Sequence, residues 1–259
     1  MLYWHKSILV YSVALIPQIH CVTQSDINEI EALGYTLIGN PQTTFEAFIN
    51  EFFPNFNLLK LIECLETNFS HTTTLKISRE IIFDQSSQKF SIKYQNNYTS
   101  EDDALIFYRE FSKIKKTIRV EHKYCVIPAV FRGSGLIKPI FQESLQQYVN
   151  FGAKQIIVHA CLSGGGYTWA RYGFNAIDKT EVTEILEQSR ISLKANEFKV
   201  VEKIYSIYYS KYPKGKEFPM SLWAELDYMK AVLLGSSWQG TVNLSKPKLF
   251  HTFERYVFK

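Results

Sequence analysis

The chain has 259 residues, of which 46% are hydrophobic and 21% charged, so it can bury a sizeable core and is not intrinsically disordered. Its 29 basic and 25 acidic residues give a net charge of +4, and the basic residues form no concentrated stripe of the kind typical of nucleic-acid-binding proteins. The four cysteines, Cys21, Cys64, Cys125 and Cys161, are too far apart for a CxxC metal or redox motif. We therefore expect buried free thiols in a reducing, cytoplasmic compartment, no bound metal and no nucleic-acid partner.

The N-terminal stretch from Ser7 to Ile19 is uncharged and mostly apolar, and it follows Lys6. This pattern resembles the hydrophobic region of a secretion signal, which stays open as an alternative. However, the stretch contains Pro17, lacks a small-x-small cleavage site and is too short to span a bilayer. We expect a buried strand or short helix here, and no membrane partner.

The next segment indicates mixed α and β structure. Apolar residues recur with helical spacing from Thr43 to Glu66, and Pro54 divides this stretch into two short helices. The polar turn 84–88 separates the first two of four strand-like segments. These segments are Leu75 to Phe83, Lys89 to Tyr94, Ala104 to Phe111 and Thr117 to Ile127.

A strand, a glycine-containing turn, a helix and a second strand follow one another between residues 117 and 160. The turn Arg132-Gly133-Ser134-Gly135 leads into a helix that should extend to Phe151, with Gly152 at its C-terminal cap. Gln155 to Ala160 is a short apolar strand. This unit predicts a right-handed crossover that joins two parallel strands.

The C-terminal region continues with a small-residue loop, Ser163 to Gly166, followed by the segment Tyr167 to Phe174. The expected helices are Lys179–Gln188, Asn196–Tyr209 and Met220–Leu234, and the expected closing strands are Ser237–Leu244 and Leu249–Phe258. The aromatic residues of this region are expected to pack as core, with a wall of the acceptor site as the alternative; they are Tyr205, Tyr208, Tyr209, Tyr212, Trp223 and Trp238. We divide the chain into an N-terminal strand and helix extension (1–40), a core (41–180), and C-terminal helices and closing strands of the same domain (181–259).

The turn before the central helix could bind an anion. Glycines let the backbone approach a phosphate closely, and the free N–H groups and dipole at a helix start favour negative charge. Arg132 and Lys138 can add positive charge. The GxxxxGK[ST] phosphate loop is absent, and Lys138 occupies the third glycine position of a dinucleotide fingerprint. An ordinary tight turn remains the alternative.

The segment 100–180 resembles the GCN5-related N-acetyltransferase family. That family carries Arg/Gln-x-x-Gly-x-Gly/Ala between a central strand and a helix, and here the segment reads Arg132-Gly133-Ser134-Gly135-Leu136-Ile137. The preceding Val126-Ile127-Pro128 is similar to the family's strand end, and Trp169 to Phe174 is similar to its helix that ends in Gly-Phe. The resemblance implies an α/β (α+β) fold with a mixed, splayed central sheet flanked by helices.

The resemblance also implies a site. Acetyl-CoA would lie between the strand that ends at Ile127 and the strand that ends at Ala160. The backbone of Val126 and Ile127 would pair with pantetheine, and the amides from Gly133 to Lys138, through Ser134, Gly135, Leu136 and Ile137, would hold the pyrophosphate with Arg132 beside them.

Two positions depart from the family pattern. Ile137 stands where the family has Gly or Ala, and its side chain could crowd the pyrophosphate. Trp169 stands where many members have a tyrosine that protonates the leaving thiolate, which tryptophan cannot do. Tyr172 is our candidate for that role, with Tyr167 as an alternative, although either phenol could simply be a hydrogen-bond donor in the core.

Transfer to an amine requires a proton acceptor, and Glu121 on the central strand is our candidate. Strand alternation places His122 on the opposite face. The alternative for Glu121 is an ion pair with Arg119 or Lys123 at the rim. His159 is expected to be structural.

These residues predict an N-acyltransferase that moves the acetyl group directly from acetyl-CoA to an amine of unknown identity on a small molecule, peptide or protein. A non-catalytic CoA-binding or interaction module of the same fold, or a secreted effector with the same chemistry, are the alternatives.

Overall fold

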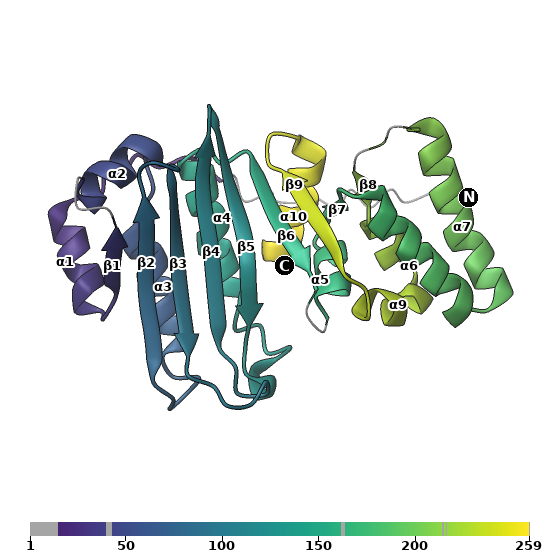
Figure 1. Cartoon of the computed structure of the whole chain (residues 1–259), viewed down its shortest axis with the longest axis horizontal. Coiled ribbons are helices and arrows are strands. Elements are labelled where there is room, and N and C mark those ends of the chain that lie inside the picture. The colour runs from purple at the N-terminus through teal and green to yellow at the C-terminus, as the bar shows by residue number, and fades with distance from the viewer. Residues whose placement is uncertain (1–14, 40–42, 162–163, 214, 216, 259) are drawn as a thin grey trace, which may run out of the picture.

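The computed structural model describes residues 15–39, 43–161, 164–213, 215 and 217–258. In this part of the chain, a single open mixed sheet is flanked by helices, which makes the fold mixed α/β (Figure 1). In chain order, the strands are β1 (Thr36–Gly39), β2 (Ile77–Asp84), β3 (Lys89–Asn96), β4 (Ile106–Ile114), β5 (Thr117–Val126), β6 (Gln155–Ala160), β7 (Asn175–Ala176), β8 (Phe218–Pro219) and β9 (Trp238–Asn243).

The strands are arranged in the order β1-β2-β3-β4-β5-β6-β9-β7-β8. β2 to β5 form an antiparallel meander, whereas β1 pairs parallel with β2 and β6 pairs parallel with β5. β9, β7 and β8 continue the sheet in antiparallel pairs. The parallel β5–β6 pair confirms the crossover expected from the sequence, and the sheet includes strands from all three expected segments.

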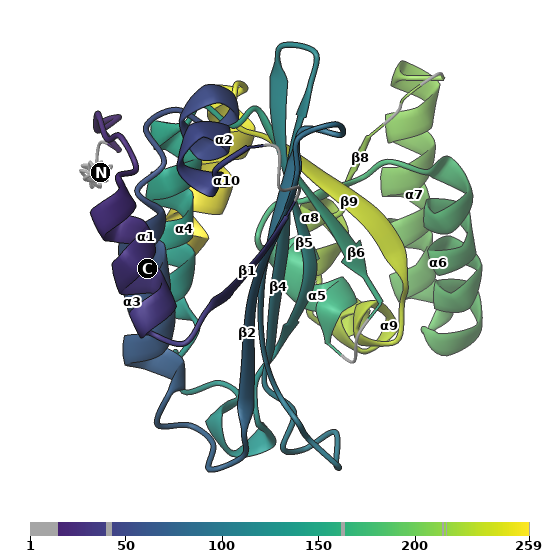
Figure 2. The same ribbon diagram turned by 60° about the vertical axis from the view of Figure 1, so that its left-hand side comes forward.

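Helices cover both sides of the sheet. They are α1 (Gln24–Ala32), α2 (Phe45–Phe52), α3 (Leu58–Phe69), α4 (Lys138–Asn150), α5 (Gly165–Arg171), α6 (Lys179–Ser192), α7 (Ala195–Lys211), α8 (Ser221–Ala224), α9 (Lys230–Leu234) and α10 (Pro247–Phe258), with short 3-10 turns at Ala129–Phe131 and Asp227–Met229. Figure 2 shows α1 to α4 and α10 together on one side of the sheet, and α6 and α7 on the other side, beyond β9. The face of β2 to β5 that points away from α2 to α4 carries ion pairs such as Glu80–Lys93 and Lys89–Glu110.

An aromatic core joins the meander to α2, α3 and α4. The rings of Phe90 and Phe111 stack with centroids 4.3 Å apart, and Phe56 and Phe151 pack on Phe111 from the helix side. The high aromatic content of the sequence therefore builds core, because inward positions of neighbouring strands bring these rings together. A second cluster around Phe218 and Trp223 joins α7 to α8. The core role expected for the C-terminal aromatics is confirmed for Tyr209, Trp223 and Trp238, which are buried, but not for Tyr212, which is 46% exposed.

The two short helices expected between residues 43 and 66 are confirmed as α2 and α3. Thr44 caps α2 by accepting a hydrogen bond from the amide of Ala47 at 3.2 Å, and Asn57 caps α3 by accepting one from the amide of Lys60 at 3.0 Å. Pro54 lies in the turn between them. The strand expected at Gln155–Ala160 matches β6 residue for residue.

The closing strand expected at Leu249–Phe258 was wrong, because this segment is helix α10. Phe253 and Val257, four residues apart, are buried against the core, and Leu249 and Phe250 pack beside them. This spacing is helical, and Pro247 fits the first turn of a helix. The single helix expected at Met220–Leu234 is divided into α8, a 3-10 turn and α9.

The N-terminal expectation also needs correction. Residues 7–14 lie outside the described part of the chain, but residues 15–23 contain neither helix nor strand. Ile16 and Ile19 are 70% and 96% exposed. The buried strand or helix expected from Ser7 to Ile19 is therefore wrong for its described end, because these side chains find no apolar surface to cover.

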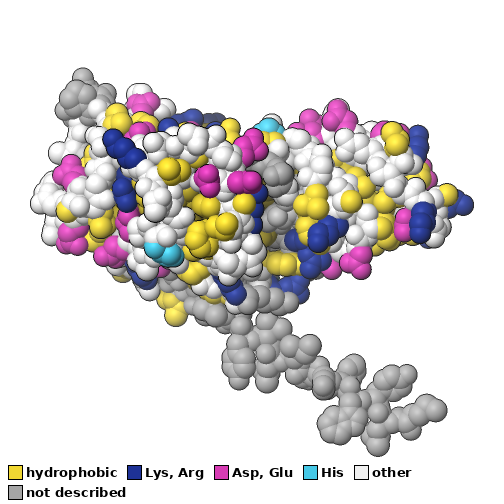
Figure 3. Space-filling model, turned by 90° about the horizontal axis from the view of Figure 1, so that it is seen from below, with side chains coloured by type: hydrophobic (Ala, Val, Ile, Leu, Met, Phe, Trp, Pro, Cys, Tyr) yellow, Lys and Arg dark blue, Asp and Glu magenta, His cyan; other side chains and the backbone are white. Residues whose placement is uncertain are grey.

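Within the described residues, no helix combines the length and the hydrophobicity needed to cross a membrane. Figure 3 views the end of the molecule where β5 leads into α4. On this face, Lys and Arg side chains are scattered among acidic and hydrophobic ones.

We expect Phe90→Ala to lower the free energy of unfolding by about 3–5 kcal/mol, because it leaves a cavity where the ring stacks on Phe111. Denaturant unfolding followed by circular dichroism measures this loss. Ile191→Ala, at a side chain that is 87% exposed, is the control and should change stability by no more than about 0.5 kcal/mol. Equal effects of the two substitutions would contradict the role given to the aromatic core.

Candidate functional site

The central feature of the candidate site is a fork between β5 and β6. The two parallel strands pair only from Arg119–Gln155 to His122–Val158. Beyond this point β5 continues along β4 to Val126, while β6 continues along β9 to Ala160. The strand ends therefore separate, and their facing backbone groups are left without a partner strand.

A β-bulge on β5 lies where the fork opens. Arg109 of β4 pairs with His122 and Tyr108 pairs with Tyr124, so Lys123 is an extra residue on β5. Such an insertion reverses the alternation of side chains beyond it. As a result His122 and Cys125, three residues apart, both line the same cavity.

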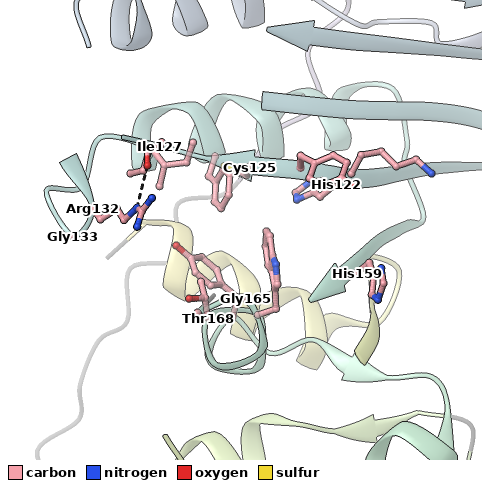
Figure 4. Close-up of a pocket in the computed structure, with 15 residues that line it drawn as sticks. His122, Cys125, Ile127, Arg132, Gly133, His159, Gly165 and Thr168 are labelled. Carbon is pink, nitrogen blue, oxygen red and sulfur yellow. Dashed lines mark hydrogen bonds between the residues drawn. The ribbon is translucent and has the colours of Figure 1, made fainter. Parts of the chain in front are cut away.

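This cavity has a volume of about 330 Å³ and lies between β5, α4 and α5 (Figure 4). Its lining is mostly apolar and aromatic, with His122 and His159 as polar groups on the two strands of the fork. The rings of Phe141 on α4 and Trp169 on α5, which both line the cavity, stack with their centroids 6.0 Å apart. A pocket of this size and lining is typical of small-molecule sites.

A second cavity of about 510 Å³ flanks the other side of the end of β5. It shares Cys125, Ile127 and Arg132 with the first cavity, and it adds Tyr98 and Glu101 from the loop between β3 and β4. The end of β5 is therefore accessible from both sides, so two ligands could approach one point from opposite directions.

The glycine turn lies at the mouth of the fork. Gly133 and Gly135 have φ values of +79° and +85°, and a Cβ at either position would meet no atom within 4 Å. Glycine is needed here for its backbone conformation, because other residues rarely adopt such φ values. The helix that follows begins at Lys138, with Ile137 as its N-cap and no side chain capping it.

The amides of the turn fall into two groups. Those of Ser134, Leu136 and Lys138 donate within the turn, to Phe131 O at 3.2 Å, Ser134 Oγ at 3.3 Å and Gly135 O at 2.9 Å. Those of Gly133, Gly135 and Ile137 have no acceptor among the described residues. Alternate amides from Gly133 to Ile137 are thus free to bind an anion, rather than every amide from Gly133 to Lys138.

Arg132 lines both cavities, but backbone carbonyls occupy part of its guanidinium. Its Nε donates to the carbonyl of Ile127 at 3.2 Å, the contact drawn in Figure 4, and its Nη2 donates to the carbonyl of Glu101 at 3.2 Å. Asp102 lies 4.0 Å from Nη1. The Ile127 carbonyl is therefore occupied, and Arg132 acts first as a brace between the strand end and the neighbouring loop. Val126 pairs with Ile106 of β4 and lines the second cavity.

His122 is buried and points to the helix side of the sheet. Its Nε2 lies 2.9 Å from the hydroxyl of Tyr148, and its Nδ1 has no partner among the described residues. Burial lowers the pKa of His122 well below its ordinary value, and the nearby charge of Arg109 lowers it further. The imidazole is therefore neutral near pH 7.

Glu121 lies on the opposite face of β5 and does not line the cavity between β5, α4 and α5. Its carboxylate forms an ion pair with Lys123 at 2.7 Å, and its side chain is 33% exposed. The rim ion pair considered from the sequence is thus present. The expected alternation of Glu121 and His122 is also present, with the histidine on the cavity side.

Of the two candidate tyrosines, Tyr172 lines the cavity and Tyr167 does not. The Tyr172 ring packs on Phe141, Trp169 and Phe253. Burial raises the pKa of Tyr172, and interaction with Cys125 raises it further, so the phenol keeps its proton at neutral pH. A phenol in this state can donate a proton but cannot accept one.

Two residues of the fork were not singled out from the sequence. Cys125 lines both cavities, which depends on the bulge and has no sequence signal. Arg109 is fully buried on β4 directly behind the fork. The inward position of Arg109 does have a sequence signal, because Arg109 is two residues from both Phe107 and Phe111 on the same strand and so shares their face. His159, expected to be structural, lines the cavity and has its Nε2 3.3 Å from Ser237 Oγ.

We expect the free energy of unfolding to fall as the pH drops below about 6.5. In this range His122 binds a proton in the unfolded state, whereas its lowered pKa keeps it neutral in the folded state. In His122→Gln, this loss between pH 7.5 and 5.5 should be smaller by about 1 kcal/mol. Urea unfolding at both pH values measures the difference. Tyr148→Phe removes the hydroxyl and keeps the buried imidazole, so it should retain the wild-type pH dependence. An unchanged dependence in His122→Gln would contradict the neutral state of this histidine.

Among the described residues, no group of three or more His, Cys, Asp or Glu is placed to hold a metal ion. In comparisons with known proteins, no family model matched the sequence, and neither a curated protein nor a solved structure matched it. Function must therefore be inferred from the geometry around the fork and from the sequence of the turn.

Proposed function

We propose that the chain is an N-acyltransferase of acetyltransferase-like fold that binds acetyl-CoA in the fork between β5 and β6 and transfers the acetyl group to an amine. The acceptor is a small molecule, a peptide or a protein. A cytoplasmic location is part of this proposal, since all four cysteines are free thiols, as is usual in reducing compartments. The expectation that these thiols are buried is wrong for Cys21 and Cys161, which are exposed.

One observation carries the proposal. The β5–β6 ladder ends after His122–Val158, and a cavity of about 330 Å³ lies just beyond that point. An extended, thin ligand such as the pantetheine arm can lie in such a gap and bond to the strand that lacks a partner. The motif 132–137 lies shortly after the end of β5, and the family resemblance read from this motif had placed the ligand between these two strands.

The turn supports binding of the pyrophosphate. The amides of Gly133, Gly135 and Ile137 have no acceptor among the described residues, and α4 begins immediately after them. Free N–H groups and the positive end of a helix dipole together stabilise a phosphate. Ile137 lines the cavity, and its side chain lies at the position where the family pattern has a small residue.

The chemistry can be assigned to groups around the fork. The amine nitrogen attacks the thioester carbon, a C–N bond forms, and the C–S bond breaks with its electron pair remaining on sulfur. Tyr172 is our candidate to protonate that sulfur, because its phenol is protonated and lines the cavity. Glu121, on the open face of the sheet, remains our candidate to accept the proton of the amine. Where the carboxylate is too far from the amine for a direct hydrogen bond, a water molecule relays the proton.

A second candidate function is a non-catalytic CoA-binding or protein-interaction module. Trp169 favours it, because this ring packs against His122 and Phe141 and cannot protonate a thiolate. Glu121 also favours it, because Lys123 neutralises its carboxylate. The two functions differ in whether CoA is released with an acetylated product. Mass spectrometry of lysine peptides, polyamines and aminoglycosides, after incubation with acetyl-CoA and the protein, separates them.

We expect acetyl-CoA to raise the thermal midpoint of the protein, because a ligand that binds only the folded state stabilises it. Gly135→Val should abolish this rise, since the valine side chain occupies the anion-binding turn and its φ of +85° is strained for any side chain. Differential scanning fluorimetry measures the shift of the thermal midpoint in the wild-type protein and in the variant.

Gly152→Val is the matched control, because Gly152 has a φ of +72° and an equally open surrounding at the far end of α4. This variant should lose stability but keep the shift induced by acetyl-CoA. A full shift in Gly135→Val would remove the turn from the binding site.

We expect Glu121→Gln to lower turnover by on the order of a hundredfold at neutral pH with little change in the affinity for acetyl-CoA. The loss should diminish at high pH, where more of the amine is already neutral. Thiol release, followed with an acceptor from the mass-spectrometric panel, measures turnover.

His122→Gln should cost less, because a histidine with a pKa well below neutral is a weak base. If His122→Gln is inactive and Glu121→Gln active, the proton acceptor lies inside the cavity instead.

A further inference from the structure

Arg109 is a buried cation that forms no ion pair with any described residue. Its side chain is fully buried at the middle of β4. Its Nη1 donates to the carbonyl oxygens of Tyr108 at 3.0 Å and Tyr124 at 2.8 Å, while Nε and Nη2 have no hydrogen-bond partner among the described residues. An arginine keeps its charge even when buried. Because removing an unpaired charge from water is costly, this arrangement calls for a functional explanation.

The guanidinium lies directly behind the fork. It packs over the ring of Phe107, with Cζ 4.2 Å from the ring centroid, and Cζ is 5.7 Å from the ring centroid of Phe141. Arg109 pairs with His122 across the ladder, at the bulge. Phe141, His122 and Tyr124 all line the cavity. Arg109 is therefore separated from the cavity by a single layer of groups, and that layer contains few polar atoms to screen its charge.

Cys125 places a sulfur atom in the fork close to the charge of Arg109. The Cys125 side chain lines both cavities at the end of β5. Burial raises the pKa of its thiol, and the charge of Arg109 acts in the opposite direction, in favour of the thiolate.

The other titratable groups around Cys125 supply no competing charge at neutral pH. His122 of β5 is held neutral, and the phenols of Tyr148 on α4 and Tyr172 on α5 are held protonated by burial. His159, Lys123 and Arg132 line the cavity further out, on the rim. The floor of the fork is thus a region of low polarity with one permanent positive charge behind it.

We infer that Arg109 stabilises the thiolate that leaves the acyl donor when the C–S bond breaks in the fork. This inference rests on the proposed acyl transfer. A fixed charge placed where negative charge develops lowers the barrier without donating a proton, so Arg109 would stabilise the sulfur while the C–S bond breaks and Tyr172 would then supply its proton. Arg109 also positions β5 through its bond to the Tyr124 carbonyl, so the test must separate charge from position.

The first arm of the test uses Cys125 as a reporter and needs no ligand. Cys21→Ser, Cys64→Ser and Cys161→Ser leave Cys125 as the remaining cysteine. In this background, the rate of Cys125 alkylation by iodoacetamide is measured from pH 6 to 10 for the protein with Arg109 and for its Arg109→Met and Arg109→Gln variants. In Arg109→Met, the titration should move to higher pH and the rate at pH 7 should fall by about tenfold, which corresponds to one pH unit. Arg109→Gln removes the charge but keeps an N–H donor for the Tyr124 carbonyl, so its titration should move in the same direction as that of Arg109→Met.

A purely positional role predicts a different result for glutamine, because Arg109→Gln would keep a bond to the Tyr124 carbonyl and only Arg109→Met would shift. A wild-type titration in Arg109→Gln, or titrations that coincide in all three proteins, overturn the inference. Circular dichroism of each variant confirms that it is folded.

The second arm uses the wild-type protein alone, so it does not depend on whether a variant folds. The affinity for CoA is compared with that for desulfo-CoA, which lacks the sulfur, by calorimetry at pH 6.5 and 8.5. Stabilisation of the thiolate predicts that CoA gains affinity relative to desulfo-CoA by several-fold to about tenfold as the pH rises. Binding of both ligands with a ratio independent of pH overturns this inference and leaves the proposed function intact. Absence of binding of both ligands overturns the proposed function, and the inference with it.

Discussion

The hydrogen-bond ladder between β5 and β6 is the constraint on which the rest of the site depends, because it lasts for only four residue pairs. Each strand is held on its other side, β5 by the antiparallel meander and β6 by β9, so neither can turn to close the gap. Backbone groups that would be satisfied inside a continuous sheet are instead presented to a cavity. The fork is thus a stable feature of a sheet made of two independently supported halves, and both candidate cavities lie at its edge.

The bulge at Lys123 decides which side chains face this gap. Without the extra residue, Cys125 would continue the parity of Glu121 and point to the open face of the sheet. With it, His122 and Cys125 share the helix side, and the Phe141, Trp169 and Tyr172 rings close over them. The rigid aromatic core behind the meander keeps this register, since slipping the strands by one residue would expose Phe90 and Phe111.

Electrostatically, the fork has two ends of different character. At its mouth, three amides of the glycine turn and the rim cation Arg132 offer contacts for an anion that stays partly in water. At its floor, the buried cation Arg109 lies behind Cys125, and the neighbouring histidine and tyrosines are held neutral by burial. Hydrated phosphates suit the first environment, whereas a charge that exists only briefly during a reaction suits the second.

The sequence alone determined the elements whose residues carry local signals. The periods of 3.6 and 2.0 located α2, α3, α4 and the strands from β2 to β6, and the two glycines with positive φ marked the turn that precedes α4. The parallel pairing of β5 with β6 also followed, because a strand, helix and strand in succession strongly favour it.

The other features of the fold were decided only in the tertiary structure, by contacts between residues that are far apart in the chain. Leu249–Phe258 is rich in aromatic and aliphatic residues that suit a strand, but the surface of α4 and β9 selects the helical spacing of Phe253 and Val257. The point where β5 and β6 separate, the bulge at Lys123 and the burial of Arg109 behind His122 arise from the pairing of strands and not from any local run of residues. The motif 132–137 could therefore be read from the chain, and the fork beside it was expected only through the resemblance that this motif carries. The charge behind the fork was not expected, because sequence neighbours fix the backbone conformation and only packing decides which groups the backbone faces.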